Sequence, residues 1–129
     1  MIVRAGGTAP WEERYGYCRV VVAGGWALTA GTTATGPDGA VLHPGDPYEQ
    51  ARSAFGIALD ALERCGARRQ DVVRTRMYVV DADHQPEVGR AHAGVFGDVR
   101  PVATMVVVQR LADAAHLVEV EVEAFTGRA

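Results

Sequence analysis

Hydrophobic and polar residues near the start of the chain form two short runs that predict a β-hairpin. The segments 17–23 (YCRVVVA) and 26–31 (WALTAG) are rich in residues that favour strands. Gly24 and Gly25 separate them, and a Gly-Gly pair is typical of tight hairpin turns. The glycine- and proline-rich stretch 32–47 then predicts a long loop.

After this loop, apolar residues recur every three or four positions, which predicts an amphipathic helix. Asp46 is typical of an N-cap, Pro47 suits the first helical position, and Gly66 suits the end of the helix. The apolar face comprises Ala51, Ala54, Phe55, Ala58, Leu59, Leu62 and Cys65. A shorter helix is predicted over 85–96, with one side formed by Val88, Ala91, His92, Val95 and Phe96.

Three later segments, 71–80, 104–110 and 117–125, predict strands. The first alternates from residue 73, so one face carries Val73, Thr75, Met77 and Val79 and the other carries Arg74, Arg76 and Tyr78. The last alternates strictly, with Val118, Val120, Val122 and Ala124 against Glu119, Glu121 and Glu123. This order predicts one α+β domain over 1–129, a mixed sheet with two helices on one face.

Composition and charge narrow the possible function classes. The chain is 48% hydrophobic and carries a net charge of −3, which fits a globular protein and offers no basic surface for nucleic acid. Two cysteines cannot form a disulfide framework, and the four histidines lack metal-ligand spacing, so we expect no metal. We also expect a cytoplasmic protein without a membrane partner, because no run approaches ~20 apolar residues and 1–10 lacks a signal-peptide pattern.

The glutamates of the last strand and one histidine are the first candidates for chemistry. The stripe Glu119, Glu121 and Glu123 is either a solvated face, a set of ion pairs with Arg74 and Arg76, or a subunit interface. In the last case a desolvated glutamate has a raised pKa and can donate as well as accept protons. His92 is either a buried or interface histidine with a satisfied hydrogen bond or an acid/base group in a pocket.

Six motifs in order resemble the Rid (YjgF-type) enamine/imine deaminase family, from about residue 16 to 125. They are Gly16-Tyr17, 27–31 (ALTAG), the helix 50–66, 71–75 (DVVRT), 101–104 (PVAT) and 117–121 (LVEVE). The resemblance implies a chorismate-mutase-like (ferredoxin-like βαββαβ-type) fold. It also implies a homotrimer whose sheets line a central barrel, with small-molecule pockets between neighbouring subunits. Low aromatic content (7%) and 15 glycines fit a chain that gains stability from such interfaces.

The family's pocket residues can be placed on this sequence motif by motif. The glutamate that handles water or a proton matches Glu119, and a shifted register makes it Glu121; the pocket tyrosine matches Tyr17. The resemblance places further substrate contacts at Ala30, Gly31, Ala103 and Thr104. It calls for no cofactor.

Three of these positions depart from the family pattern. Ala103 stands where the best-known subgroup has a carboxylate-binding arginine, Ala30 replaces a serine, and Gly89 replaces an asparagine. A methyl group cannot replace a guanidinium fork, so standard 2-iminoacids are expected to bind poorly. The candidates for a replacement anion contact are Arg19, Arg100 and His92.

Two functions therefore remain open. One is cofactor-free hydrolysis of a small enamine or imine, with Glu119 as acid/base and Tyr17 and His92 positioning the substrate. The other is a trimeric protein that binds or senses a metabolite in the same clefts without turnover. A ribonuclease or translation-inhibitor role has been attached to the family, but the acidic balance of this chain disfavours it.

Overall fold

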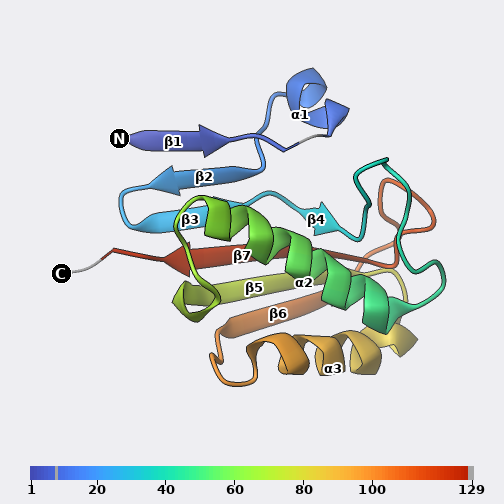
Figure 1. The fold of residues 1–129 in the computed structure, drawn as a ribbon. Helices are drawn as coiled ribbons and strands as arrows, with labels where there is room; N and C mark the ends of the chain where they lie inside the picture. Colours follow the sequence, from blue (N-terminus) through green and yellow to red (C-terminus); the bar gives the residue numbers. More distant parts are fainter. Residues whose placement is uncertain (8, 128–129) are drawn as a thin grey trace.

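A mixed seven-stranded β-sheet runs through the centre of the molecule (Figure 1). The computed structural model describes residues 1–7 and 9–127. The sheet order is β1-β2-β3-β7-β5-β6, and β4 pairs with β7 beside β3. The strands are β1 Ile2–Ala5, β2 Val20–Ala23, β3 Trp26–Thr29, β4 Thr32–Thr33, β5 Val72–Val79, β6 Val102–Val107 and β7 Val118–Phe125.

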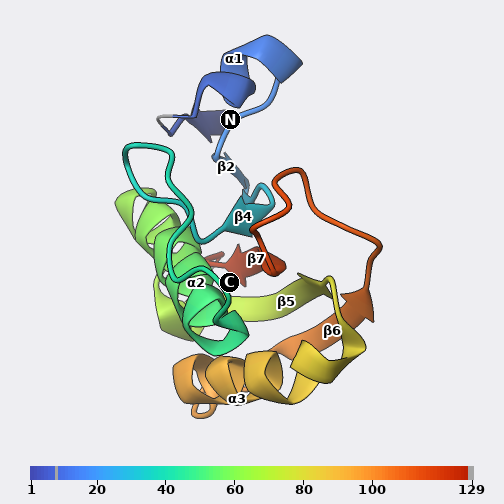
Figure 2. The same ribbon diagram turned by 90° about the vertical axis from the view of Figure 1, so that its right-hand side faces the viewer.

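Two helices, α2 (Pro47–Arg64) and α3 (Gln85–Phe96), cover the same face of this sheet (Figure 1). The short helix α1 (Pro10–Tyr15) lies apart from them, beyond the β1–β2 edge (Figure 2). Two 3₁₀ turns, Arg69–Asp71 and Ala82–His84, precede β5 and α3. The predicted α+β domain with two helices on one face is confirmed, and α1 is an addition to it.

The termini of α2 form as the sequence predicts. The Asp46 carboxylate accepts a hydrogen bond from the Glu49 N–H at 3.0 Å, and Gly66 takes a left-handed φ of 90° just after the helix. The buried side of α2 combines three alanines with two larger residues, Phe55 and Leu62. Small side chains let the helix approach the sheet closely, and the ring of Phe55 packs edge-on against Phe96 of α3.

Strand β7 lies in the middle of the sheet and separates its two faces. Val118, Val120, Val122 and Ala124 are fully buried beneath the helices. The alternating residues Glu119, Glu121 and Glu123 therefore point to the opposite face, which no helix of the described chain covers. We call this the uncovered face.

The N-terminal elements and several strand ends differ from the prediction. Strands β1 and β4 and helix α1 are not predicted; β1 is a largely exposed edge strand, and β4 has only two residues, so neither shows a periodic pattern. Strand β2 begins at Val20 rather than at residue 17, because Gly16 ends α1 in a left-handed turn and the Tyr17 N–H still donates to Glu12. Strand β6 spans 102–107 instead of 104–110.

The prediction that Val73 shares a face with Thr75, Met77 and Val79 was wrong. Val73 is 40% exposed, whereas Val72 is 3% exposed and faces the core. A register irregularity between Val72 and Arg74, where β5 pairs with β7, inserts the extra residue. A bulge of this kind shifts the alternation by one position, after which Thr75, Met77 and Val79 face the core as predicted.

Gln50 is a fully buried polar residue that ties two loops to α2. Its amide nitrogen donates to the carbonyl oxygens of His43 (3.3 Å) and Ala115 (3.1 Å), and its oxygen accepts from the Leu117 N–H (2.8 Å). These bonds fix the segment that leads into β7, because backbone groups at such depth need a partner.

We expect Gln50→Ala to lower the free energy of unfolding by about 3 kcal/mol, because a cavity forms and buried backbone groups lose their partners. Urea denaturation measures this change. The exposed Gln70 provides a matched control, and Gln70→Ala should change stability by less than about 0.5 kcal/mol. Equal effects of the two substitutions would show that the buried Gln50 amide contributes no more to stability than the exposed Gln70 side chain.

Candidate functional site

Glu119 lies on the uncovered face near the start of β7, with its side chain half-buried. Strand pairing places Thr33 of β4 on one side of it and Tyr78 of β5 on the other. Residues directly opposite in an antiparallel pair share a face, with Cβ atoms about 5 Å apart. Glu119 is therefore flanked by two hydroxyl-bearing side chains.

The carboxyl group of Glu119 packs onto the backbone of Gly31. A Cβ atom at Gly31 would overlap Oε2 of Glu119, so the close approach requires glycine at this position. Arg19 donates from Nη2 to the carbonyl oxygen of Gly31 at 2.8 Å, and its guanidinium lies 5.9 Å from the centre of the Tyr17 ring. The hairpin thus supplies Tyr17, Arg19 and Gly31 to the surroundings of Glu119, and Ala30 precedes Gly31.

The electrostatic surroundings of Glu119 favour its protonated form. Burial raises the pKa of its carboxyl group above the usual range, and the negative charge of Glu121 raises the pKa further. Arg19, and His116 when charged, lower the pKa of Glu119, but by less than these two causes raise it. A carboxyl group with a raised pKa can donate a proton as well as accept one.

The other two glutamates of β7 are occupied by ion pairs with β5. Arg74 lies 3.1 Å from Glu123, and Arg76 lies 3.2 Å from Glu123 and 3.6 Å from Glu121. The Tyr78 hydroxyl donates to Oε2 of Glu121 at 2.8 Å, which raises the pKa of Tyr78. Within residues 1–7 and 9–127, Glu119 alone of the three makes no ion pair, so the geometry favours Glu119 over Glu121 as the available acid.

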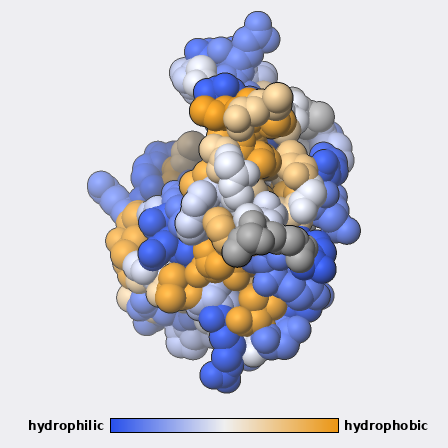
Figure 3. All heavy atoms as spheres, turned by 90° about the vertical axis from the view of Figure 1, so that its left-hand side faces the viewer, coloured by the Kyte–Doolittle hydropathy of each residue, from blue (hydrophilic) through white to orange (hydrophobic). Residues whose placement is uncertain are grey.

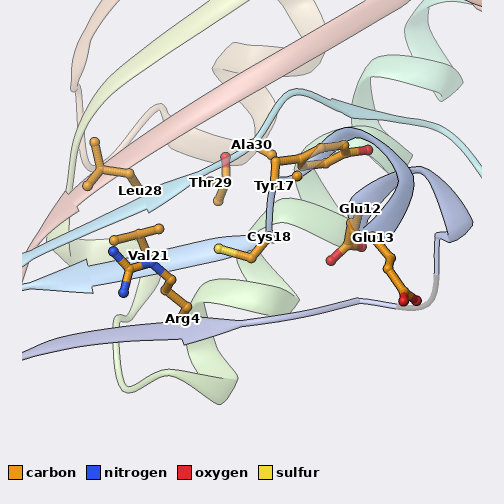
Figure 4. Close-up of a pocket in the computed structure, with 10 residues that line it drawn as sticks. Arg4, Glu12, Glu13, Tyr17, Cys18, Val21, Leu28, Thr29 and Ala30 are labelled. Carbon is orange, nitrogen blue, oxygen red and sulfur yellow. The ribbon is translucent and has the colours of Figure 1, made fainter.

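Cavities adjoin the hairpin, and Glu119 lines the larger of the two described here. The larger one, about 1400 Å³, lies between the N-terminal segment and the body of the domain, and its lining includes Tyr17, Arg19, Gly31, His116 and Glu119. The smaller one, about 600 Å³, lies over β1, β2 and β3, and Figure 4 shows its lining. Tyr17 lines both cavities and is 40% exposed, and Ala30 lines the smaller one. Both cavities open to the surface.

The structure does not bring His92 to Glu119, contrary to the expectation that both position the same substrate. His92 lies on α3, and its Nε2 is 2.8 Å from the Thr75 hydroxyl on the helix-covered face. Its ring packs against both Phe55 and Phe96, and burial lowers the pKa of the imidazole. Within one chain, the sheet separates His92 from Glu119. Of the two alternatives for His92, the structure shows the histidine with a satisfied hydrogen bond.

Ala103 and Thr104 lie on the edge strand β6, away from Glu119. Ala103 pairs with Thr75, so its methyl group lies on the same side as His92, whereas Thr104 pairs with Arg76 on the uncovered face. The exposed Arg100, the remaining candidate for an anion contact, donates to the carbonyl oxygen of Gly97 at the end of α3. The residues predicted to line one pocket thus form two groups in the single chain.

Three further residues lie near Glu119 that no sequence motif indicates. The Thr33 and Thr35 hydroxyl oxygens are 2.8 Å apart, and Thr35 is 3.0 Å from Nε2 of the buried His116. All three residues line the larger cavity together with Glu119. His116 and Thr35 are 81 positions apart in the sequence, so no local pattern could have found this contact.

Neither a metal cluster nor a membrane span is found in the described part of the chain. No three His, Cys, Asp or Glu side chains of residues 1–7 and 9–127 are grouped to hold a metal ion. None of the helices described above is long and apolar enough to cross a bilayer.

Comparisons with known proteins agree in relating this chain to one protein family. The family model described as Endoribonuclease L-PSP matches residues 8–126. An uncharacterised protein of Streptomyces coelicolor is 45% identical over 119 residues, which are 92% of this chain and 88% of that protein. A RutC family protein of Pyrococcus abyssi is 27% identical over 109 residues, 84% of this chain and 85% of the relative.

Solved structures have the same architecture. A Mycobacterium tuberculosis protein described as a member of the highly conserved YjgF/YER057c/UK114 family superposes with a TM-score of 0.87 at 38% identity, covering 97% of this chain and 99% of that one. A Yersinia pestis protein described as belonging to the conserved Rid protein family has a TM-score of 0.81 at 22% identity, covering 95% and 93%. The second likeness concerns the fold alone.

We expect Gly31→Ala to push the Glu119 carboxyl group toward solvent, because the added methyl group takes its place. The pKa of Glu119 should then fall toward the usual glutamate value of about 4.3. Carbon-detected NMR of the carboxyl group across a pH series measures it. Gly56→Ala on α2, where a Cβ meets open space, is the control and should leave this titration unchanged. An identical Glu119 midpoint in both variants would contradict the packing argument.

Proposed function

The chain belongs to the Rid (YjgF/YER057c/UK114) family, and from this premise we propose that it hydrolyses a small enamine or imine without a cofactor, in a cleft between copies of the chain. The observation that carries the proposal is the half-buried Glu119 carboxyl group, which packs onto Gly31, makes no ion pair within the described residues, and has a raised pKa. Arg19 and Tyr17 stand beside it.

The reaction needs little more than a positioned acid/base group. An imine carbon becomes electrophilic when its nitrogen is protonated, and Glu119 in its protonated form can supply that proton. The resulting carboxylate takes a proton from water as the water oxygen bonds to the carbon, which gives a carbinolamine. Glu119 then returns this proton to the nitrogen and takes the proton of the carbinolamine hydroxyl as the C–N bond breaks. One water is consumed, ammonia and a carbonyl compound leave, and Glu119 ends in its protonated form.

The distribution of site residues supports a cleft made by two chains. Glu119 and Gly31 lie on one side of the sheet, whereas Ala103 and His92 lie toward the helix-covered side of the edge strand β6. A pocket that includes both groups requires the edge of one copy to meet the uncovered face of another. The uncovered face also exposes apolar residues, among them Val102 and Val106, around its ion pairs. We therefore propose a homotrimer.

The substrate is proposed to lack the carboxylate of the standard 2-iminoacids. Ala103, at the position of the family's carboxylate-binding arginine, is exposed and offers only a methyl group. Arg19 is not at this position within the chain, because its Nη2 donates to the carbonyl oxygen of Gly31, on the opposite side of β7 from β6. A neutral or cationic enamine or imine suits such a pocket better than an anionic one.

The same substitution supports a second candidate, a trimer that binds a metabolite without turning it over. Ala103, Ala30 and Gly89 together remove a guanidinium, a hydroxyl and an amide from the family's pattern. A ligand can still bind in the cleft without these groups, but it is then less precisely oriented for reaction. A ligand that raises the melting temperature and is recovered chemically unchanged would favour this candidate.

An RNA substrate, which the family model's description suggests, fits the charges of this chain less well. The net charge is −3, and the two arginines that stand on β5 of the uncovered face are paired with Glu121 and Glu123. Phosphate binding draws its affinity from unpaired Lys and Arg, so this face offers RNA little attraction.

We expect Glu119→Gln to reduce ammonia release from a panel of freshly generated small imines by at least about 100-fold, because the acid/base group is lost. A coupled enzymatic assay for ammonia measures the rate. Glu121→Gln, on the same strand but within the ion-pair network, is the control and should retain most of the activity. If Glu121→Gln abolishes activity and Glu119→Gln does not, the assignment of Glu119 is wrong.

We expect the wild-type chain to sediment as a trimer at micromolar concentration. Val106→Glu should shift it toward monomer, because a charge is then buried where the edge strand β6 of one copy meets the uncovered face of another. Glu63→Lys, on the exposed side of α2, should remain trimeric. Analytical ultracentrifugation makes the measurement, and a monomeric wild type would contradict every function placed in a cleft between chains.

A further inference from the structure

Helix α1 buries a charged residue and exposes its aromatic ones. Glu12 is 8% exposed, whereas Trp11 and Tyr15 on the same helix are 48% and 69% exposed. The N-terminal elements project from the body of the molecule (Figures 2 and 3). Packing alone favours the reverse arrangement, because aromatic rings gain free energy from burial and a carboxylate loses its hydration. The burial of Glu12 therefore indicates a role other than packing.

The carboxyl group of Glu12 has one partnered and one unpartnered oxygen. Oε1 accepts from the Gly7 N–H at 2.8 Å. Oε2 is buried and has no hydrogen-bond partner within residues 1–7 and 9–127, and the same holds for Nε of Arg19. The two atoms are complementary, because a carboxylate oxygen accepts hydrogen bonds and a guanidinium nitrogen donates them. Most buried polar groups are partnered, so two complementary exceptions indicate a place where another molecule supplies the partners.

The two unpartnered atoms lie close to Gly7 and to each other. A Cβ atom at Gly7 would lie 2.8 Å from Oε2 of Glu12 and 3.5 Å from Cδ of Arg19, the carbon that carries Nε. No hydrogen bond joins Oε2 to Nε in the part of the chain that the structure describes, so a gap remains between them. Both residues line the larger cavity, which Glu119 also lines.

We propose that Glu12 and Arg19 bind a neutral amide-type group of the substrate, one that presents an N–H donor beside a carbonyl acceptor. Oε2 of Glu12 accepts from the N–H, and Nε of Arg19 donates to the carbonyl oxygen. This inference rests on the proposed function and names its substrate class, a small enamine or imine that carries a carboxamide or ureido group in place of a carboxylate. Glu12 is then a residue that determines specificity.

The charges of the pair favour a neutral group over an ion. A carboxylate on the ligand would bond to Arg19 but would be repelled by Glu12, and an ammonium group would do the reverse. An amide satisfies both unpartnered atoms, because its N–H and its carbonyl oxygen lie side by side. The alanine at position 103 agrees with this choice, since it offers no guanidinium for a carboxylate.

The side chain of Arg19 connects this pair to the candidate acid. Its Nη2 donates to the carbonyl oxygen of Gly31 at 2.8 Å, and the Glu119 carboxyl group packs onto Gly31. Glu12 and Glu119 therefore stand near opposite ends of one arginine side chain. A small substrate can contact Glu12 through its amide while its reacting nitrogen meets Glu119.

Access to Oε2 of Glu12 depends on the backbone of Gly6 and Gly7, which lies against the carboxyl group. Both glycines are exposed, and neither carries a side chain that would have to move aside. Glu12 also lines the smaller cavity (Figure 4), so open space adjoins this residue. A small displacement of the glycine backbone is enough to let an amide group reach Oε2.

The closing experiment compares three probes of similar shape on the assembled protein: isobutyramide, isobutyrate and isobutylammonium. The backbone N–H resonance of Gly7 reports binding, because this group donates to Glu12. In the wild type we expect isobutyramide to bind at least about tenfold more tightly than either ion. Glu12→Gln retains an oxygen for the Gly7 N–H but replaces the acceptor Oε2 by a donor, so it should abolish this preference.

Glu13→Gln is the matched control, because Glu13 is an exposed neighbour on α1 that does not line the larger cavity. It makes the same change of charge and should leave the preference for the amide intact. Equal effects of the two substitutions, a wild-type preference for isobutylammonium, or no response of Gly7 to isobutyramide would overturn the proposal. A Glu12→Gln protein that is less stable to urea but keeps the preference would mark a structural role and would also overturn it.

Kinetics connect the amide site to turnover. The freshly generated imine of alaninamide is compared with that of alanine, and we expect kcat/KM to be at least about tenfold higher for the amide in the wild type but not in Glu12→Gln. Probe selectivity that depends on Glu12, in a protein that releases no ammonia from either imine, overturns the proposed function and supports the amide site. Ammonia release with an amide preference unchanged in Glu12→Gln leaves the proposed function in place and overturns the site.

Discussion

The central strand β7 has one buried apolar face and one charged face. This alternation determines how the rest of the structure is arranged around it. Its valines are fully buried under α2 and α3, so they fix the register of the strand. A shift by one residue would bury three carboxylates and expose the core. The same alternation therefore forces Glu119 onto the uncovered face, where β4 and the hairpin close around it. The position of the acid is a consequence of how the core is packed.

Helices and strands that show a repeating pattern within their own residues could be predicted from the sequence. The cap at Asp46, the apolar face of α2 and the alternation of β7 each repeat several times, so local pattern and tertiary packing agree. The elements that could not be predicted are short or depend on distant partners. Strand β1 exists because it pairs with β2, and β4 because it pairs with β7. The bulge near Val73 reflects the fit between β5 and β7, which no single strand encodes.

The candidate site divides in the same way. Glu119, Tyr17 and Gly31 were found through motifs, and the structure places all three around one cavity. His92 stands on the apolar side of a helix, which left both a buried histidine and a pocket group open, and in this chain its ring bonds to Thr75 on the helix-covered face. The hydroxyl chain to His116 was missed because it joins residues that only the fold brings together. Motifs indicate which chemistry is available, and packing decides which groups share a site.

Glu119 packs on Gly31, away from the ion pairs of its neighbours, and its pKa is raised above that of an ordinary exposed carboxylate. The most direct measurement is the pH titration of the Glu119 carboxyl carbon in the assembled wild-type protein. We expect a midpoint clearly above the usual glutamate value of about 4.3, because burial and Glu121 both favour the protonated form. A midpoint at or below that value would show an ordinary ionised surface carboxylate and would contradict the account.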